Sequence, residues 1–170
     1  PDVYRQWFEL IASGADRAFF LTNASLSGLA ARASVPIVGI ALSLLLLAGS
    51  ALWAMAGRRS TLEVSAIALV IALLASPIAW IHYTLFLLPV LFWKWRLDGV
   101  RLVAALLIVP VPFIIGQFGR SAWTQLTIGS IYNWALVLLL AVLLADEVQR
   151  SGLPSFRAAW WRRSDPALQG

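Results

Sequence analysis

Long apolar segments alternate with short polar ones along most of this chain. The clearest apolar segment covers residues 35–56 and holds twenty-two residues without a formal charge. A helix rises about 1.5 Å per residue, so this segment would span about 33 Å, enough to cross the roughly 30 Å hydrocarbon core of a bilayer. Further apolar segments follow at 64–93, 100–118 and 128–145. The pattern predicts an all-α, polytopic helical membrane protein.

Segment 64–93 is too long for one straight span, because a helix of its length would reach about 45 Å. Pro77 and Pro89 each remove a backbone donor and clash with the preceding turn, which makes them natural break points. We therefore expect a break at Pro77–His82 and a short span of about 21 Å after it. About five transmembrane helices result: 35–56, 64–81, 80–93, 100–118 and 128–145.

The two ends of the chain carry a different pattern. In residues 1–34, apolar positions recur at helical spacing opposite polar ones, which predicts amphipathic and connector helices on the membrane surface. Residues 146–170 combine arginines with Phe and Trp, and this basic aromatic tail suits an anionic leaflet. Residue 1 is not Met and no signal-peptide pattern follows it, so we expect the sequence to be the C-terminal portion of a longer protein.

Composition narrows the class of protein. Hydrophobic residues make up 61% of the 170 positions and charged residues only 12%, whereas soluble domains are near half apolar and a quarter charged. Much of the surface must therefore contact lipid. The sequence has no cysteine, which excludes disulfides and thiolate metal sites, and it has no Gly-x-x-x-x-Gly-Lys motif for phosphates. We expect neither a metal nor a cofactor.

The net charge of +5 does not indicate nucleic-acid binding, because the basic residues stand at the ends of apolar segments. Basic residues in such positions indicate how the chain is oriented in the membrane. With five spans, nine Lys and Arg residues lie on one side and four on the other, so the richer side is cytoplasmic. The C-terminus is then cytoplasmic and residues 94–101 supply basic and aromatic anchors there. The N-terminal segment, the break and the 119–127 loop share the outer face. A four-span arrangement, with 64–93 as one tilted helix, has a similar charge bias.

The one histidine of the chain lies at the predicted break. Irregular backbone at membrane depth is tolerated only beside other protein or a water-filled cavity, and a titratable imidazole there is a candidate functional group. The alternative is a structural role, in which His82 hydrogen-bonds to carbonyls freed by Pro77 while Trp80 and Tyr83 are interfacial aromatic residues. Further along the chain, Asn133 is expected to hydrogen-bond between helices.

Two motifs resemble those of a known family. Residues 76–82, Ser-Pro-x-x-Trp-x-His, with the apolar run and Leu-Leu-Pro that follow, resemble the conserved core of bacterial glycosyltransferase family 87. The family has a serine in place of Ala79 and a second histidine in place of Tyr83. It also carries Asn-Gln-Ser-Leu, then a small residue and an arginine, before a transmembrane helix. Similar residues here are Asn23, Ser25, Leu26, Gly28 and Arg32, with Ala24 in place of the glutamine.

Members of that family are integral membrane enzymes of the GT-C class that transfer mannose or arabinofuranose from a polyprenyl-phosphate sugar to a lipid-linked acceptor. The resemblance implies a GT-C-like fold with its active site on the outer face of a bacterial plasma (inner) membrane. Its partners would be the sugar donor, the lipid-linked glycan acceptor and membrane lipids, with no nucleic acid. The resemblance implies His82 as the catalytic residue and, as substrate-binding residues, Asn23, Ser25, Arg32, Ser76, Trp80 and Tyr83.

Within this interpretation, His82 shuttles the acceptor's proton or donates a hydrogen bond to the leaving phosphate. Arg32 and Arg120 are candidates for two-pronged phosphate pairing. The catalytic carboxylate typical of the class has no match here, so we expect it upstream of residue 1. Two alternatives from other classes stay open. One is half of a transporter or flippase, which also uses broken helices at the membrane midplane, and the other is a non-catalytic membrane scaffold.

Overall fold

The computed structural model describes residues 2–6, 19–56 and 60–151. Within these ranges the regular elements are helices, which confirms the all-α prediction. Residues 7–18 and 152–170, to which much of the amphipathic N-terminal segment and most of the basic aromatic tail are assigned, lie outside the described residues. The elements in chain order are α3 (Leu26–Arg32), α4 (Pro36–Met55), α5 (Thr61–Ala75), η1 (Ile81–Leu87), α6 (Leu88–Trp93), α7 (Asp98–Leu107), α8 (Val111–Ile115), α9 (Ala122–Leu126), η2 (Ile128–Ser130) and α10 (Ile131–Ser151).

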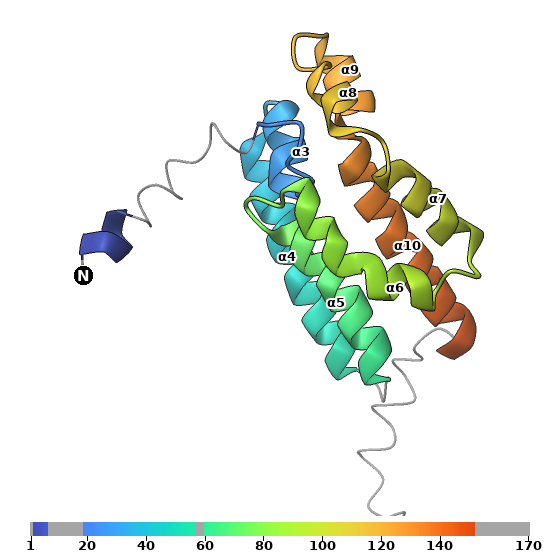
Figure 1. The fold of residues 1–170 in the computed structure, drawn as a ribbon. Coiled ribbons are helices and arrows are strands. Elements are labelled where there is room, and N and C mark those ends of the chain that lie inside the picture. Colours follow the sequence, from blue (N-terminus) through green and yellow to red (C-terminus); the bar gives the residue numbers. More distant parts are fainter. Residues whose placement is uncertain (1, 7–18, 57–59, 152–170) are drawn as a thin grey trace, which may run out of the picture.

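Helices α4 and α5 form an antiparallel hairpin, and α3 packs against α4 at one end of it (Figure 1). Helix α4 begins at Pro36, whose missing N–H is no loss in the first turn of a helix. Helix α5 begins after Ser60, whose hydroxyl accepts a hydrogen bond from the Glu63 amide at 3.4 Å. The Glu63 carboxylate also lies in the first turn, where it faces the positive end of the helix dipole.

The chain breaks where the prolines predict it. Helix α5 ends at Ala75, and Ser76 has extended backbone with φ −60° and ψ 140°, since the ring of a following proline disfavours the α region. The predicted span 64–81 is therefore shorter than expected. Its continuation is also different: 80–93 is not one α-helix but a 3₁₀ helix, η1, followed by α6. Pro89 lies in the first turn of α6, so the α-helix restarts at the proline instead of kinking there.

The predicted span 100–118 is likewise divided. Helix α7 ends at Leu107 and α8 begins at Val111, with Pro110 between them. The expectation of one helix over 100–118 was wrong, because the backbone leaves the helix before the proline. The carbonyl of Val109, freed by this interruption, accepts a hydrogen bond from the Tyr132 hydroxyl at 2.6 Å.

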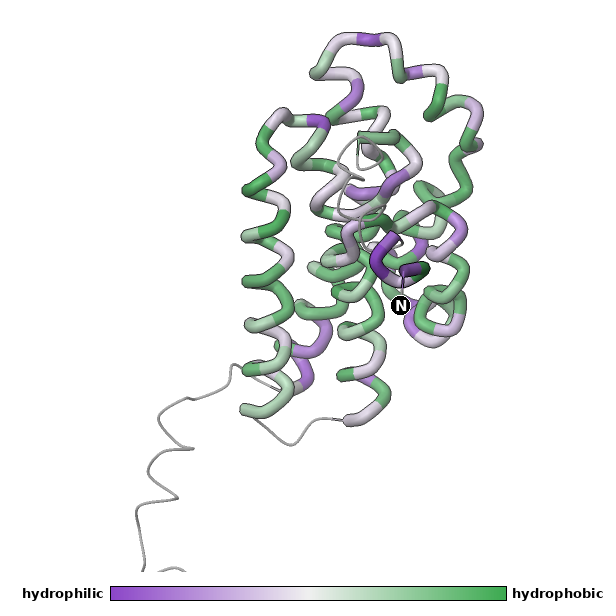
Figure 2. Tube along the Cα trace, turned by 90° about the vertical axis from the view of Figure 1, so that its left-hand side faces the viewer, coloured by the Kyte–Doolittle hydropathy of each residue, from purple (hydrophilic) through white to green (hydrophobic). Residues whose placement is uncertain are grey.

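Among the described residues, two helical stretches are long and apolar enough to cross a membrane, Pro36–Met55 and Ala122–Arg150. Thr61–Ala75 and Ile81–Trp93 are apolar but shorter. Hydrophobic residues line most of the length of the bundle (Figure 2). Only 11% of the apolar window of α4 is buried inside the protein, so its side chains meet whatever surrounds the molecule. That surface fits contact with lipid.

Helix α10 packs against both α5 and α7 and holds the centre of the core. The buried apolar side chains at its interfaces include Val70, Leu74, Val103, Leu136 and Leu139. The segment before α3, the break after α5 and the α8–α9 region all lie toward one end of the bundle (Figure 1). The start of α5, the end of α6 and the end of α10 lie toward the other. The two motifs therefore share one end.

Candidate functional site

Asn23 joins the two motifs that the sequence sets more than fifty residues apart. Its side chain is fully buried. The Oδ1 atom accepts hydrogen bonds from the Ala79 amide at 2.9 Å and from the Ser25 amide at 3.2 Å. The Nδ2 group donates to the Pro77 carbonyl at 3.4 Å. One side chain thus bonds to both sides of the break.

Backbone hydrogen bonds add to this connection. Asn23 and Trp80 form an isolated antiparallel bridge. On either side of it, the Ala24 amide donates to the Ala79 carbonyl at 2.7 Å and the Ile81 amide donates to the Thr22 carbonyl at 3.1 Å. Breaking a helix leaves backbone donors and acceptors without partners, and in an apolar setting each must be satisfied by other protein. The segment before α3 supplies those partners.

Ser25 is also fully buried, and its hydroxyl bonds both to α3 and to the break. Its hydroxyl caps α3 by accepting from the Gly28 amide at 3.0 Å, and it donates to the Pro77 carbonyl at 3.4 Å. Gly28 is close behind: a Cβ atom there would lie 2.8 Å from the Asn23 carbonyl oxygen. The small residue in this motif therefore has a steric reason, because it leaves room for Asn23.

Arg32 is buried beneath these residues, with 3% of its surface exposed. Its Nε donates to the Ser130 hydroxyl at 2.9 Å, and its Nη1 donates to the carbonyls of Phe20 at 2.8 Å and Asn23 at 3.3 Å. Its Nη2 donates to the Asn23 carbonyl at 3.3 Å and to Asn133 Oδ1. These bonds use all five donors that a guanidinium has.

The Arg32 guanidinium consequently faces the protein and not a ligand. Burial lowers the pKa of Arg32 to about 10, because desolvation disfavours the charged form, and the group is still a cation at neutral pH. In the described part of the chain no carboxylate pairs with it; its acceptors are carbonyl, amide and hydroxyl oxygens. The two-pronged phosphate contact expected for Arg32 is therefore not available in this structure.

Asn133 and Ser130 belong to this cluster, although neither is among the predicted site residues. Asn133 is fully buried, and its Nδ2 donates to the Ser25 carbonyl at 2.6 Å while its Oδ1 accepts from Arg32. Ser130 accepts from Arg32 and donates to the Gln125 carbonyl at 2.7 Å. The sequence did signal Asn133, because an amide in an apolar helix predicts a hydrogen bond between helices, but it did not identify the partner of that bond.

The remaining predicted residues lie on the break and on η1. The Ser76 hydroxyl donates to the Ile78 carbonyl at 2.7 Å, so it holds the turn itself. The Trp80 ring is half-buried and lies 6.1 Å from the Phe20 ring, centroid to centroid. Tyr83 is exposed, and its ring stacks on that of Phe86 at 6.4 Å. Trp80 and Tyr83 are thus aromatic neighbours of His82 in the chain, two residues before it and one residue after it.

His82 is exposed in the first turn of η1. Its ring meets the Tyr83 ring edge-on at 4.5 Å. The structural alternative requires a hydrogen bond from His82 to a carbonyl freed by Pro77, which is the carbonyl of Leu73, four residues earlier. None of the described residues hydrogen-bonds to the imidazole, so both ring nitrogens can meet an external group.

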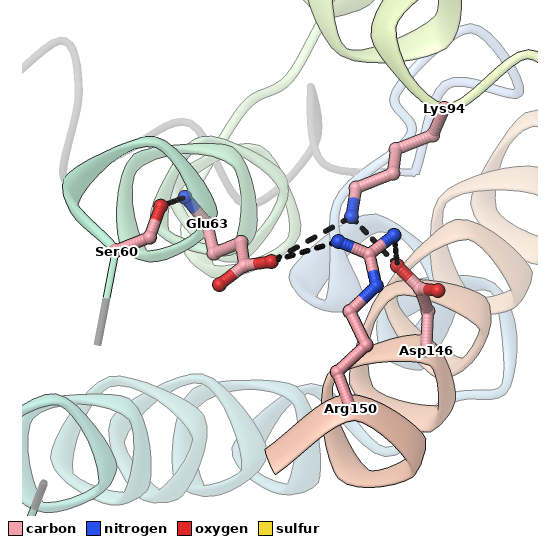
Figure 3. Close-up of polar contacts among 5 residues, drawn as sticks. All are labelled: Ser60, Glu63, Lys94, Asp146 and Arg150. Carbon is pink, nitrogen blue, oxygen red and sulfur yellow. Dashed lines mark hydrogen bonds and ion pairs between the residues drawn. The ribbon is translucent and has the colours of Figure 1, made fainter. Parts of the chain in front are cut away.

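A second polar cluster lies at the opposite end of the bundle (Figure 3). Lys94, at the end of α6, places its Nζ 2.6 Å from Asp146 Oδ2 on α10 and 3.9 Å from Glu63 Oε1 on α5. Arg150 bonds to the same two carboxylates, at 3.1 Å to Glu63 and 2.8 Å to Asp146. Lys94 is only 5% exposed. Its predicted role as a surface anchor was wrong, because three helices converge on its side chain.

Comparisons of this chain with protein-family models, with curated proteins and with solved structures found no match. The likeness to family 87 therefore rests on the two motifs. In the described part of the chain, no three histidine, aspartate or glutamate side chains gather in a way that could hold a metal ion. The chemistry open to this end of the bundle is that of His82, its aromatic neighbours and the backbone of the break.

Proposed function

We propose that the chain is the C-terminal part of an integral membrane glycosyltransferase. In this proposal, mannose or arabinofuranose moves from a polyprenyl-phosphate donor to a lipid-linked acceptor at the outer face of a bacterial plasma membrane. The observation that carries the proposal is the meeting of the two motifs at Asn23, which bonds to Pro77 and Ala79. This contact brings the two motifs of the family likeness to one end of the bundle, as a single site would require.

His82 has the catalytic role in this proposal. Transfer to a hydroxyl acceptor requires that a proton leave the hydroxyl and that charge on the departing phosphate be stabilised. An imidazole can do either near neutral pH. Two observations support this assignment: His82 is exposed, and none of the described residues hydrogen-bonds to its ring.

The surroundings of His82 suit an amphipathic substrate. The faces of Trp80 and Tyr83 are suited to contact with a sugar ring. Leu85 and Phe86, one turn further along η1, are among the exposed large apolar side chains and suit a polyprenyl tail. Arg32, Asn23 and Ser25 serve the site by shaping its backbone, because their polar atoms are used within the protein.

The membrane arrangement is part of the same proposal. Five spans are formed by α4, α5, η1 with α6, α7 with α8, and α10. Helix α5 has 15 residues and reaches about 22 Å, less than a hydrocarbon core of about 30 Å. The break after it would then lie below the outer surface, so that a recess above it admits substrate. The charge bias of nine against four supports placing the motif end outside.

The test is His82→Ala in the full-length protein, assayed in membranes with a labelled polyprenyl-phosphate sugar and a lipid acceptor. We expect kcat to fall by about 10²- to 10⁴-fold, the usual contribution of acid–base help. The melting temperature should not change, because His82 is exposed and none of the described residues hydrogen-bonds to its ring. Phe92→Leu is the matched control, because Phe92 is also exposed and lies near the end of α6, the helix that follows η1. A wild-type rate in His82→Ala would contradict the proposal.

A further inference from the structure

Arg32, on α3, bonds directly to two other stretches of the chain and is connected to a third through Asn23. The guanidinium bonds to Phe20 and Asn23, which precede α3, and to Ser130 and Asn133, which lie at the start of the last long helix. Asn23 in turn bonds to the break through Pro77 and Ala79. A continuous set of buried hydrogen bonds therefore runs from α10 to the backbone beside His82.

Because Arg32 is charged, the protein is sensitive to the loss of any one hydrogen bond in this set. A buried cation without a carboxylate is stabilised only by the oxygens that surround it, and the loss of one acceptor leaves a charged donor unsatisfied. Ser130 and Asn133 supply two of those oxygens from side chains. The other acceptors are the backbone carbonyls of Phe20 and Asn23, and Arg32 therefore fixes their positions. The side chains of Ser130 in η2 and Asn133 in α10 thus orient Arg32, and Arg32 orients the Asn23 backbone.

Asn133 acts a second time on the same segment. Its Nδ2 donates to the Ser25 carbonyl at 2.6 Å, while the Ser25 hydroxyl donates to the Pro77 carbonyl. The amide of Asn133 is thereby fixed at both ends, with one end on Arg32 and the other on Ser25. Neither Asn133 nor Ser130 reaches the surface, so neither can touch a substrate directly.

We propose that Ser130 and Asn133 are positioning residues for the His82 segment, and that they act through Arg32 and Asn23. Their hydrogen bonds set the backbone from Ser76 to Ile81 and hence the direction in which the next residue, His82, is presented. The effect on sugar transfer rests on the proposed function. The effect on the backbone does not, and it can be measured separately.

The experiment compares amide hydrogen exchange in the full-length protein, held in lipid nanodiscs, for wild type, Asn133→Ala and Ser130→Ala. The reporters are the amides of Ala24, Ala79 and Ile81, whose bonds join the break to the segment before α3. Losing one supporting hydrogen bond should speed their exchange about tenfold in each variant. Exchange in α7, which takes no part in the network, should stay as in wild type.

Two further variants make the result specific. Asn133→Asp keeps an oxygen for Arg32 but loses the Nδ2 donor to the Ser25 carbonyl, so exchange at the break should still be faster than in wild type. Trp134→Phe changes the next residue, which is partly exposed and bonds to Leu126 instead of the network, and should have no effect on the break. Wild-type exchange in Asn133→Ala and Ser130→Ala would overturn the proposal. Equal acceleration in α7 would do so too, because it would indicate a general loss of stability.

Activity separates this inference from the proposed function. If the wild type transfers sugar, Asn133→Ala should lower kcat by about 10- to 100-fold with little change in KM, as expected for a misplaced catalytic group. If exchange responds as expected but the wild type transfers no sugar, the proposed function fails and the positioning role stands. If the wild type is active and the variants match it in both exchange and kcat, the positioning role fails alone.

Discussion

Asn23 and Gly28 show how one small residue makes room for one amide. The Asn23 side chain is fully buried and bonds to both sides of the break. Its carbonyl and its Cγ and Nδ2 atoms occupy the space that a side chain at position 28 would need. The tolerance of the site to change is therefore set by the Asn23 backbone and by a side chain that its hydrogen bonds hold in place.

Gly28→Ala should consequently destabilise the protein. The new Cβ would lie 2.8 Å from the Asn23 carbonyl oxygen, closer than real contacts allow, and overpacking of this kind costs about 1–3 kcal/mol. Gly49→Ala is the matched control, because a Cβ there would meet nothing within 4 Å. In the interior of α4 that change should stabilise by about 0.5–1 kcal/mol. Unfolding in detergent measures both, and equal effects at the two positions would refute the steric argument.

The arm formed by η1 and α6 is the element that carries His82. It is held at its start by Asn23 and at its end by Lys94, whose Nζ contacts Asp146 and Glu63 (Figure 3). The 3₁₀ stretch between them has no hydroxyl or carboxylate cap at its start. Its placement therefore depends on these polar contacts at both ends and on packing against α5.

Lys94→Ala should destabilise the protein strongly. Removing one member of a buried ion pair leaves the other unpaired, at a cost of about 3–5 kcal/mol. The lower end of that range applies here, because Arg150 still pairs with Glu63 and Asp146. Arg101→Ala removes a pair with Asp98 that is 52% and 95% exposed, and such surface pairs contribute about 0–1 kcal/mol. Chemical unfolding of the two variants should differ accordingly, and similar losses would show that burial of Lys94 has no energetic role.

At the scale of the whole molecule, the two polar clusters lie at opposite ends of an apolar bundle (Figure 1, Figure 2). The end with the two motifs also carries Arg120, and the end with Lys94 also carries Arg96. In the proposed five-span topology these ends lie on opposite sides of the membrane. The four-span arrangement also has one span, 100–118, between the two arginines, so these positions test which end of the bundle faces outward.

Cysteine labelling tests that topology, since the native sequence contains no cysteine. A thiol-reactive probe that does not cross membranes should label Arg120→Cys in intact cells, because both the loop and the side chain are exposed. Arg96→Cys, also exposed, should be labelled only after the membrane is opened. Labelling of Arg96→Cys from outside would reject the five-span arrangement.

The sequence was sufficient for features that follow from local chemistry. Uniform apolar character from 35 to 56 predicted the long helix α4, because length and hydrophobicity are properties of the segment itself. Pro77 predicted the end of α5, since a proline restricts its own backbone and that of the residue before it. The same reasoning was less accurate at 100–118, where one helix was expected and two are found.

Only the tertiary structure decided which polar groups face a ligand and which face the protein. Arg32 and His82 are both functional candidates by sequence, yet one has all five donors bonded internally and the other is exposed without a described hydrogen-bond partner. The physical reason is that a hydrogen bond between residues far apart depends on where the backbone has already placed both of them. Neighbouring residues in the sequence determine helix length and break points. The contacts of Asn133 with Ser25 and Arg32 form only when helices that are distant in the sequence pack together.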